Sequence, residues 1–184
     1  DITGNMYYYS EIAYVKKLTY LQELFMIKNL KICYIGGGSR NWAWTLMKDL
    51  AQEHDLSGTV YLYDRDHEAA LANQDVGNRL MDQYNKHQWK FKAEHSLEKA
   101  LVGSDFVFIS ILPADFSEMA IDVHEPEKYG IYQSVGDTAG PGGIIRALRT
   151  IPIYQGFARA IGEWAPNAWV LNYTNPMTLC TRTL

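Results

Sequence analysis

The fold is decided by residues 30–39, which read Leu-Lys-Ile-Cys-Tyr-Ile-Gly-Gly-Gly-Ser. The first six residues are typical of a short apolar strand, and three glycines follow it at once. Residues 42–53 then have the apolar spacing of a helix, with Trp42, Leu46 and Leu50 predicted on one face and Ala43 as a further candidate for it. A strand that runs through glycines into a helix can bind a pyrophosphate, because no Cβ blocks its approach and the helix N-terminus offers free N–H groups.

Strands and helices alternate along the rest of the chain. We predict further strands at 59–63, 89–93, 105–111 and 168–172, and further helices at 67–86, 96–102 and 142–164. The run at 105–111 is almost wholly apolar, which is typical of a strand buried on both faces. The alternation predicts an α/β fold with a doubly wound, mostly parallel sheet, a Rossmann-like dinucleotide-binding domain.

Composition narrows the class of protein. The chain has 184 residues, enough for one ordinary domain, and its 47% apolar and 21% charged residues are typical of a globular protein. A formal net charge of -4 argues against binding to nucleic acid or to an anionic membrane. No apolar run reaches the roughly 18 residues that cross a bilayer. Cys33 and Cys180 are too few for a disulfide framework, and we expect reduced thiols in a cytoplasmic protein.

The first 25 residues differ from the rest of the chain. They are crowded with tyrosine, and no apolar core follows the basic pair Lys16 and Lys17 as it would in a secretory signal. We interpret residues 1–25 as an extension outside the domain, either a short amphipathic helix or a non-native segment before a natural start at Met26. The domain is expected to occupy residues 26–184.

The glycine stretch has an acidic partner. Gly36 and Gly38 match the first two glycines of the dinucleotide pattern, although Asn41 stands where the third would be. Asp64 ends the second predicted strand, where a carboxylate accepts ribose hydroxyls and repels a 2′-phosphate. These positions predict an NAD site, with Arg65 leaving NADP open and a purely structural turn as the alternative. The candidate cofactor-binding residues are Gly36, Gly37, Gly38, Ser39, Arg40, Asp64 and Ser110. For Ser110 the alternative is a buried hydroxyl with an internal partner.

Three stretches in this order resemble glycoside hydrolase family 4, the NAD- and metal-dependent glycosidases. They are the glycine stretch at 36–39, the segment 129–143 with its Gly-Pro-Gly-Gly run, and Asn-Tyr-Thr-Asn-Pro at 172–176. The resemblance covers about residues 26–184. The amino-acid sequence of segment 129–143 is most similar to that of the branch that acts on uronic-acid glycosides, the α-galacturonidases and α-glucuronidases.

The resemblance implies an unusual reaction. Bound NAD would take a hydride from the C3 hydroxyl of the sugar, and the resulting ketone would acidify the C2 proton so that the C1–O bond breaks by elimination. Water then adds and the hydride returns. A divalent metal, usually Mn²⁺ in the family, would polarise the oxygens at C2 and C3. The implied partner is a small carbohydrate, and the full-length protein would be a homo-oligomer, a dimer or a tetramer.

The resemblance also suggests substrate-binding residues. Asn175 matches a substrate-contacting asparagine of the family, with a turn role before Pro176 as the alternative. Asn172 ends the last predicted strand and is expected to contact the cofactor or the sugar. Asp137 stands where many members carry Glu, so its role is open, and it could instead cap the turn at Gly136. The glycines that follow are expected to shape part of the sugar pocket.

The segment 111–127 carries five acidic residues and no Lys or Arg. Members of the family that cleave 6-phosphosugars have an arginine there, and a phosphate would be repelled by these carboxylates, so phosphosugars are disfavoured. The carboxylate of a uronic acid also needs a cation. Arg146 and Arg149 are the candidates, with ordinary charges on a helix surface as the alternative.

The catalytic and metal-binding residues of the family are expected beyond Leu184. Cys180 falls too early to match the family's metal-binding cysteine, so we predict a buried helix thiol. None of the five histidines, His54, His67, His87, His95 and His124, has the spacing of metal ligands. We therefore expect no metal site in this chain, a missing C-terminal substrate and metal domain, and weak NAD binding without hydrolysis.

Two other functions fit the same glycine stretch. A 2-hydroxy-acid dehydrogenase of the lactate or malate type shares the glycines and the acidic partner, but it needs an Arg-bearing loop after the fourth strand, which segment 111–127 does not supply. A non-catalytic NAD-binding fragment is the third interpretation.

Overall fold

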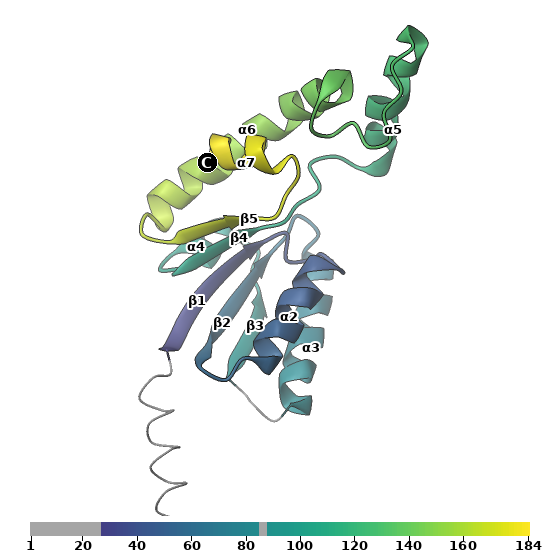
Figure 1. Cartoon of the computed structure of the whole chain (residues 1–184). Coiled ribbons are helices and arrows are strands. Elements are labelled where there is room, and N and C mark those ends of the chain that lie inside the picture. Colours follow the sequence, from purple (N-terminus) through teal and green to yellow (C-terminus); the bar gives the residue numbers. More distant parts are fainter. Residues whose placement is uncertain (1–26, 85–87) are drawn as a thin grey trace, which may run out of the picture.

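Five parallel strands form one sheet in the order β3-β2-β1-β4-β5 (Figure 1). The computed structural model describes residues 27–84 and 88–184, so the extension predicted over residues 1–25 lies outside the described residues. The strands are β1 (Ile27–Ile35), β2 (Leu56–Tyr63), β3 (Trp89–Ala93), β4 (Phe106–Ile109) and β5 (Trp169–Asn172). The predicted doubly wound α/β class is confirmed, and every strand pair is parallel.

Helices cover both faces of the sheet because β2 and β3 are added on one side of β1, and β4 and β5 are then added on its other side, through right-handed crossovers (Figure 1). The helical segments are α2 (Trp42–Gln52), α3 (His67–Gln83), α4 (Leu97–Leu101), α5 (Phe116–His124), the 3₁₀ helix η1 (Glu125–Tyr129), α6 (Gly140–Trp164) and α7 (Met177–Thr183). Helices α2 and α3 pack on one face, and α4, α6 and α7 pack on the other. Helix α5 projects away from the sheet (Figure 1).

Side-chain caps define several helix starts. The Asp66 carboxylate accepts a hydrogen bond from the amide of Ala69 at α3, and the predicted cap Ser96 accepts one from the amide of Lys99 at α4. Asp115 and Glu118 form a reciprocal capping box at α5. The sequence analysis did not predict α5 or η1, although the Asp-x-x-Glu spacing was a readable signal for the former.

The predicted buried face of α2 was partly wrong. The side chains that point to the sheet are Ala43, Met47, Leu50 and Ala51. Trp42 is 50% exposed, and its ring lies 5.8 Å from that of Tyr173, just beyond β5. The Trp42 indole therefore packs against Tyr173 at the rim of the sheet and not beneath α2.

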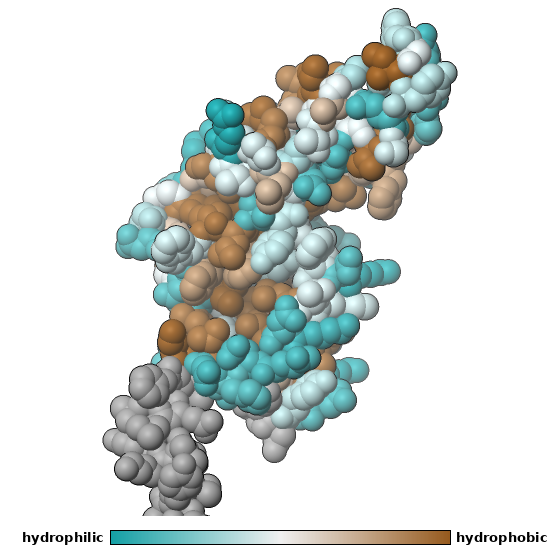
Figure 2. Space-filling view, in the orientation of Figure 1, coloured by the Kyte–Doolittle hydropathy of each residue, from teal (hydrophilic) through white to brown (hydrophobic). Residues whose placement is uncertain are grey.

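One face of the sheet is only half covered. On the side of α2 and α3, Phe106, Phe108 and Leu171 of β4 and β5 are only partly buried, and Trp169 is 75% exposed. Figure 2 shows a hydrophobic band over this part of the sheet. Within the described residues, no helix has the length and hydropathy required to cross a membrane.

Candidate functional site

The glycine loop lies where the strand order reverses, between the carboxyl ends of β1 and β4. Gly36 follows β1 with a φ of +96°, and a Cβ at this position would collide with the carbonyl oxygen of Ser110, which follows β4. The amide of Ser110 donates to the carbonyl of Ile35 at 2.9 Å. Only glycine fits this close approach between the two strand ends.

Gly37 and Gly38 hold the loop against β2. A Cβ on Gly37 would lie 2.6 Å from the Cβ of Leu62, and one on Gly38 would lie 2.9 Å from Oδ2 of Asp64. The amides of Gly36 and Gly37 both donate to the carbonyl of Tyr63. The loop backbone is therefore fastened to the end of β2, and it carries no side chain that would cover it from a ligand.

The predicted acidic partner lies against this loop. The Asp64 carboxylate accepts hydrogen bonds from the amide of Gly38 at 2.9 Å and from that of Asp66 at 3.0 Å. Each carboxylate oxygen has a second lone pair, so the group can also accept from a diol. The geometry brings Asp64 and the glycine loop together, as an NAD site requires, while the contact with NAD itself stays a prediction.

The other cofactor candidates line the same edge. The Ser39 hydroxyl accepts from the amide of Trp42, the first residue of α2, at 3.2 Å, and Arg40 is exposed beside it. Ser110 is buried and shares a side-chain hydrogen bond with Tyr34, so an internal partner is available to its hydroxyl. Burial raises the pKa of Tyr34 to about 12, which keeps this phenol protonated.

Asn73 is a functional residue that the sequence analysis missed. It lies on α3 and is only 3% exposed. Its amide donates to the carbonyls of Gly37 at 2.8 Å and Ser39 at 2.9 Å, and its oxygen accepts from the indole N–H of Trp44 at 2.8 Å. Asn73 thus ties the glycine loop to two helices. Its signal was a polar residue in register with the buried positions Ala70 and Gly77 of α3.

Asn172 holds the turn after β5. Its Oδ1 accepts from the hydroxyl of Tyr154 at 2.7 Å and from the amide of Thr174 at 3.1 Å, while Nδ2 donates to the carbonyl of Thr174 at 3.1 Å. Burial raises the pKa of Tyr154 above its ordinary value, so its hydroxyl remains a donor. Both ends of the Asn172 amide have internal partners here, and its contact with cofactor or sugar stays a prediction.

Asn175 and Asp137 lie in loops at the carboxyl side of the sheet. The Asn175 side chain is exposed, the following peptide bond to Pro176 is cis, and its carbonyl accepts from Nη2 of Arg146 at 3.4 Å. The Asp137 carboxylate accepts from the hydroxyl of Thr138 at 3.1 Å. The exposed amide of Asn175 is available to a ligand, and the substrate roles of both residues stay predictions.

No cluster of three His, Cys, Asp or Glu side chains suited to a metal exists among the described residues. The rings of His67 and His95 stack with centroids 3.3 Å apart, which is a contact between planes and not a chelate. Cys180 is a free thiol, fully buried on α7, and burial raises its pKa. The prediction of a buried helix thiol is therefore confirmed. A cavity of about 520 Å³ near Lys31 and Thr59 lies away from the glycine loop.

Comparison with known proteins supports this geometry. The model of the family described as Family 4 glycosyl hydrolase matches residues 31–184. An α-galacturonidase of Thermoanaerobacter italicus is 63% identical over 158 residues, which are 86% of this chain and 34% of that protein. The chain therefore spans about a third of the length of this relative.

Solved structures of similar proteins show the same fold over most of this chain. The Bacillus subtilis protein lplD, described as a glucosidase, is 54% identical with a TM-score of 0.81 over 85% of this chain and 35% of its own. A 6-phospho-β-glucosidase of Thermotoga maritima, solved with manganese, NAD⁺ and glucose-6-phosphate, is 28% identical with a TM-score of 0.68 over 80% of this chain and 35% of its own. With a family match that takes in the glycine loop, Asp64 and the turn after β5, the chain belongs to family 4 of the glycosyl hydrolases.

Proposed function

We propose that this chain is the nucleotide-binding part of an NAD-dependent glycosidase that hydrolyses uronic-acid glycosides, with α-galacturonides as the first candidate substrates. The observation that carries the proposal is the Asp64 carboxylate, 2.9 Å from the amide of Gly38 in the glycine loop. The 63% identity to an α-galacturonidase supports the choice of substrate. Family membership favours this reaction over a lactate- or malate-type dehydrogenase.

The described residues fit NAD. Gly36, Gly37 and Gly38 form a cradle whose space a Cβ would fill, and the N-terminus of α2 points a positive dipole toward a pyrophosphate. Asp64 would accept the ribose hydroxyls and repel the 2′-phosphate of NADP. When bound, NAD would supply hydride acceptance and return at the C3 carbon of the sugar. The protein's own part is to hold the dinucleotide at the strand ends, where the exposed amide of Asn175 can bind a sugar hydroxyl.

Manganese differs from NAD in that the described residues do not fit it. The described residues offer no cluster that would hold it, so we assign it no ligand and no step within this chain. We propose that the metal ligands and the base for the elimination belong to other parts of a longer enzyme, which is expected to be a dimer or a tetramer. The transient oxidation at C3 is likewise part of the proposal, supported by the resemblance to the family.

Calorimetry on the chain tests whether it binds NAD and whether it prefers NAD to NADP. We expect heat of binding with NAD and a weaker signal with NADP. Asp64→Asn should weaken NAD binding about tenfold, because an amide presents a donor where the loop and the ribose both need an acceptor. Asp75→Asn, which removes the same charge from an exposed position on α3, should leave affinity unchanged. No heat with NAD on folded material, or tighter binding of NADP, contradicts the proposal.

Activity tests the reaction. Residues 27–184 would replace the matching third of the Thermoanaerobacter italicus α-galacturonidase, and release of nitrophenol from a nitrophenyl α-galacturonide would be followed with and without NAD and Mn²⁺. We expect hydrolysis that requires both additions and no net NADH. Accumulation of NADH with substrate would point to a dehydrogenase instead.

A further inference from the structure

Arg146 is a buried cation without a buried anion. It lies on the second turn of α6 and is 6% exposed. Among the described residues, its single hydrogen bond, from Nη2 to the carbonyl of Asn175, is long at 3.4 Å, and its Nε has no partner. Across residues 27–84 and 88–184, no carboxylate lies within 4.0 Å of its guanidinium. A buried charge is costly unless an opposite charge and hydrogen bonds compensate it, so this site is short of an anion.

The neighbouring arginine on the same helix shows the contrast. Arg149 donates from Nη1 to Oδ1 of Asp122 at 3.0 Å, and its Nη2 also contacts Oδ2 of that carboxylate. Asp122 is buried on α5, so the pair fastens α5 to α6. The Asp122 carboxylate raises the pKa of Arg149. The two arginines were equal candidates in the sequence, but the structure neutralises only Arg149.

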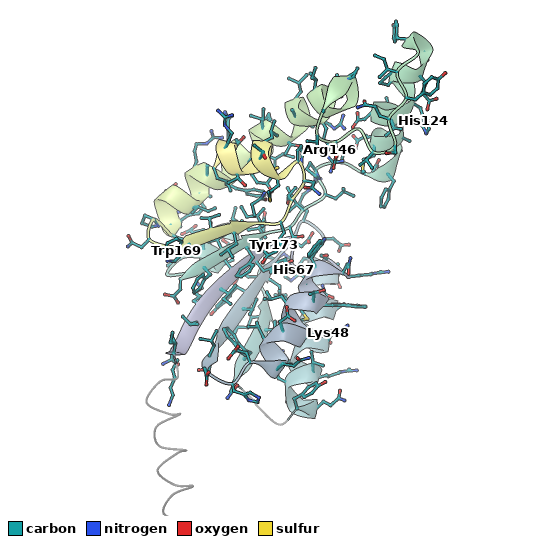
Figure 3. The ribbon with its side chains drawn as sticks, in the orientation of Figure 1. Lys48, His67, His124, Arg146, Trp169 and Tyr173 are labelled. Atoms are coloured by element: carbon teal, nitrogen blue, oxygen red, sulfur yellow. The ribbon has the colours of Figure 1, made fainter. Side chains whose placement is uncertain are left out.

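The position of Arg146 is also informative. Its guanidinium lies beside the turn that joins β5 to α7, next to the backbone of Asn175 (Figure 3). That turn carries the exposed amide that we propose to contact the sugar. The helix that bears Arg146 begins at Gly140, directly after the loop that contains Asp137. Arg146 is thus buried at the edge where a sugar would sit, and it is not a charge on the helix surface.

We propose that Arg146 recognises the carboxylate of the uronic-acid substrate and thereby sets specificity for uronides over neutral glycosides. The inference rests on the proposed function. The buried, unpartnered Nε and the weakly engaged Nη2 form one edge of the guanidinium, and two parallel N–H groups on that edge match the two oxygens of a carboxylate. A neutral hexose leaves the buried cation unpaired, and a site with an unpaired buried polar group discriminates strongly against such a ligand.

Ligand titration of the chain tests this inference. With NAD present, we expect galacturonate to bind about tenfold or more tightly than galactose, measured from chemical-shift changes in NMR spectra. Arg146→Lys and Arg146→Gln should remove most of that preference. The matched control is Arg159→Gln, which takes the same charge from an exposed position on α6 and should retain the preference.

The outcomes separate the two proposals. Equal binding of galacturonate and galactose to the unmodified chain, or an unchanged preference in Arg146→Lys, overturns the inference. A loss of thermal stability in both variants with no change in sugar preference also overturns it, since it shows a purely structural role. NAD binding, measured separately by calorimetry, reports on the proposed function. In the chimaeric enzyme, Arg146→Lys should raise KM for a nitrophenyl galacturonide about tenfold or more with a smaller change in kcat.

Discussion

The two halves of the sheet differ in where their side chains find partners. In the first half, residues 27–93, Asn73 and Asp64 bond to the glycine loop, and α2 and α3 cover the strands. In the second half, residues 97–184, Arg146 is buried without a carboxylate, and large apolar side chains such as Phe116 and Trp169 are exposed. In the first half, the glycine loop therefore has hydrogen-bond partners within the domain. Among the described residues, the second half leaves this cation without a carboxylate and these apolar side chains in solvent, which are features typical of a surface that meets a ligand or another protein.

The two edge strands give the largest expected contrast. Trp89 on β3 is 3% exposed and packs in the core of the first half, whereas Trp169 begins β5 in the open. Trp89→Ala should lower the free energy of unfolding by about 3–5 kcal/mol, because it leaves a cavity. Trp169→Ala should change it by less than about 0.5 kcal/mol. Urea denaturation of both variants measures the difference. Equal losses in the free energy of unfolding would contradict the proposed difference between the two halves.

A pair of glycines gives the next effect. Gly36→Ala places a Cβ against the carbonyl of Ser110 at a positive φ, so we expect a loss of about 2–3 kcal/mol and weaker NAD binding. Gly156, within α6, has open space where a Cβ would lie. Gly156→Ala should be neutral or stabilise by up to about 1 kcal/mol. Thermal unfolding and NAD calorimetry provide the test, and a tolerated Gly36→Ala would refute the close approach.

The two asparagines Asn73 and Asn175 should differ in how much their side chains contribute to stability. Asn73→Ala removes three hydrogen bonds around the glycine loop, and we expect a cost of about 2 kcal/mol because buried loop carbonyls lose their donors. Asn175→Ala removes an exposed amide and should cost less than about 0.5 kcal/mol. Both are measured by chemical denaturation. If Asn175→Ala proved as costly as Asn73→Ala, the Asn175 side chain would have an internal partner and would not be available to a ligand.

Alkaline pH gives the smallest effect. Burial raises the pKa of Cys33 to about 12 from 9.0, so the thiol stays protonated in the folded chain while the unfolded chain ionises first. Its contribution to stability is full below pH 9 and declines above it. By pH 10 the loss should be about 1 kcal/mol. Cys33→Ala should flatten this part of the pH profile of the unfolding free energy, and an unchanged slope would assign it to other groups.

Local sequence patterns predicted the strands and the glycine loop well. The apolar runs and the glycines that mark them are adjacent in the sequence, as in residues 30–39 and in the run that contains β4, so no distant contact is needed to recognise them. Helix α5 was missed because it is short and packs against α6 and η1 rather than on the sheet, so it does not belong to the alternation of strands and helices from which the fold was predicted. Asn73 was missed because its partners lie 29 to 36 positions away in the sequence. The choice between Arg146 and Arg149 depends on how α5 meets α6, a tertiary contact that no local pattern encodes.

The double hydrogen bonding of Asp64 has a consequence for attempts to change coenzyme preference. Its carboxylate accepts from the amides of Gly38 and Asp66. The usual first step toward NADP binding is to exchange this carboxylate for a small neutral residue. That exchange would also remove the acceptor for both amides and so destabilise the backbone that binds the dinucleotide. Successful redesign has to install a replacement acceptor for these amides before a cation such as Arg65 is recruited to the added phosphate.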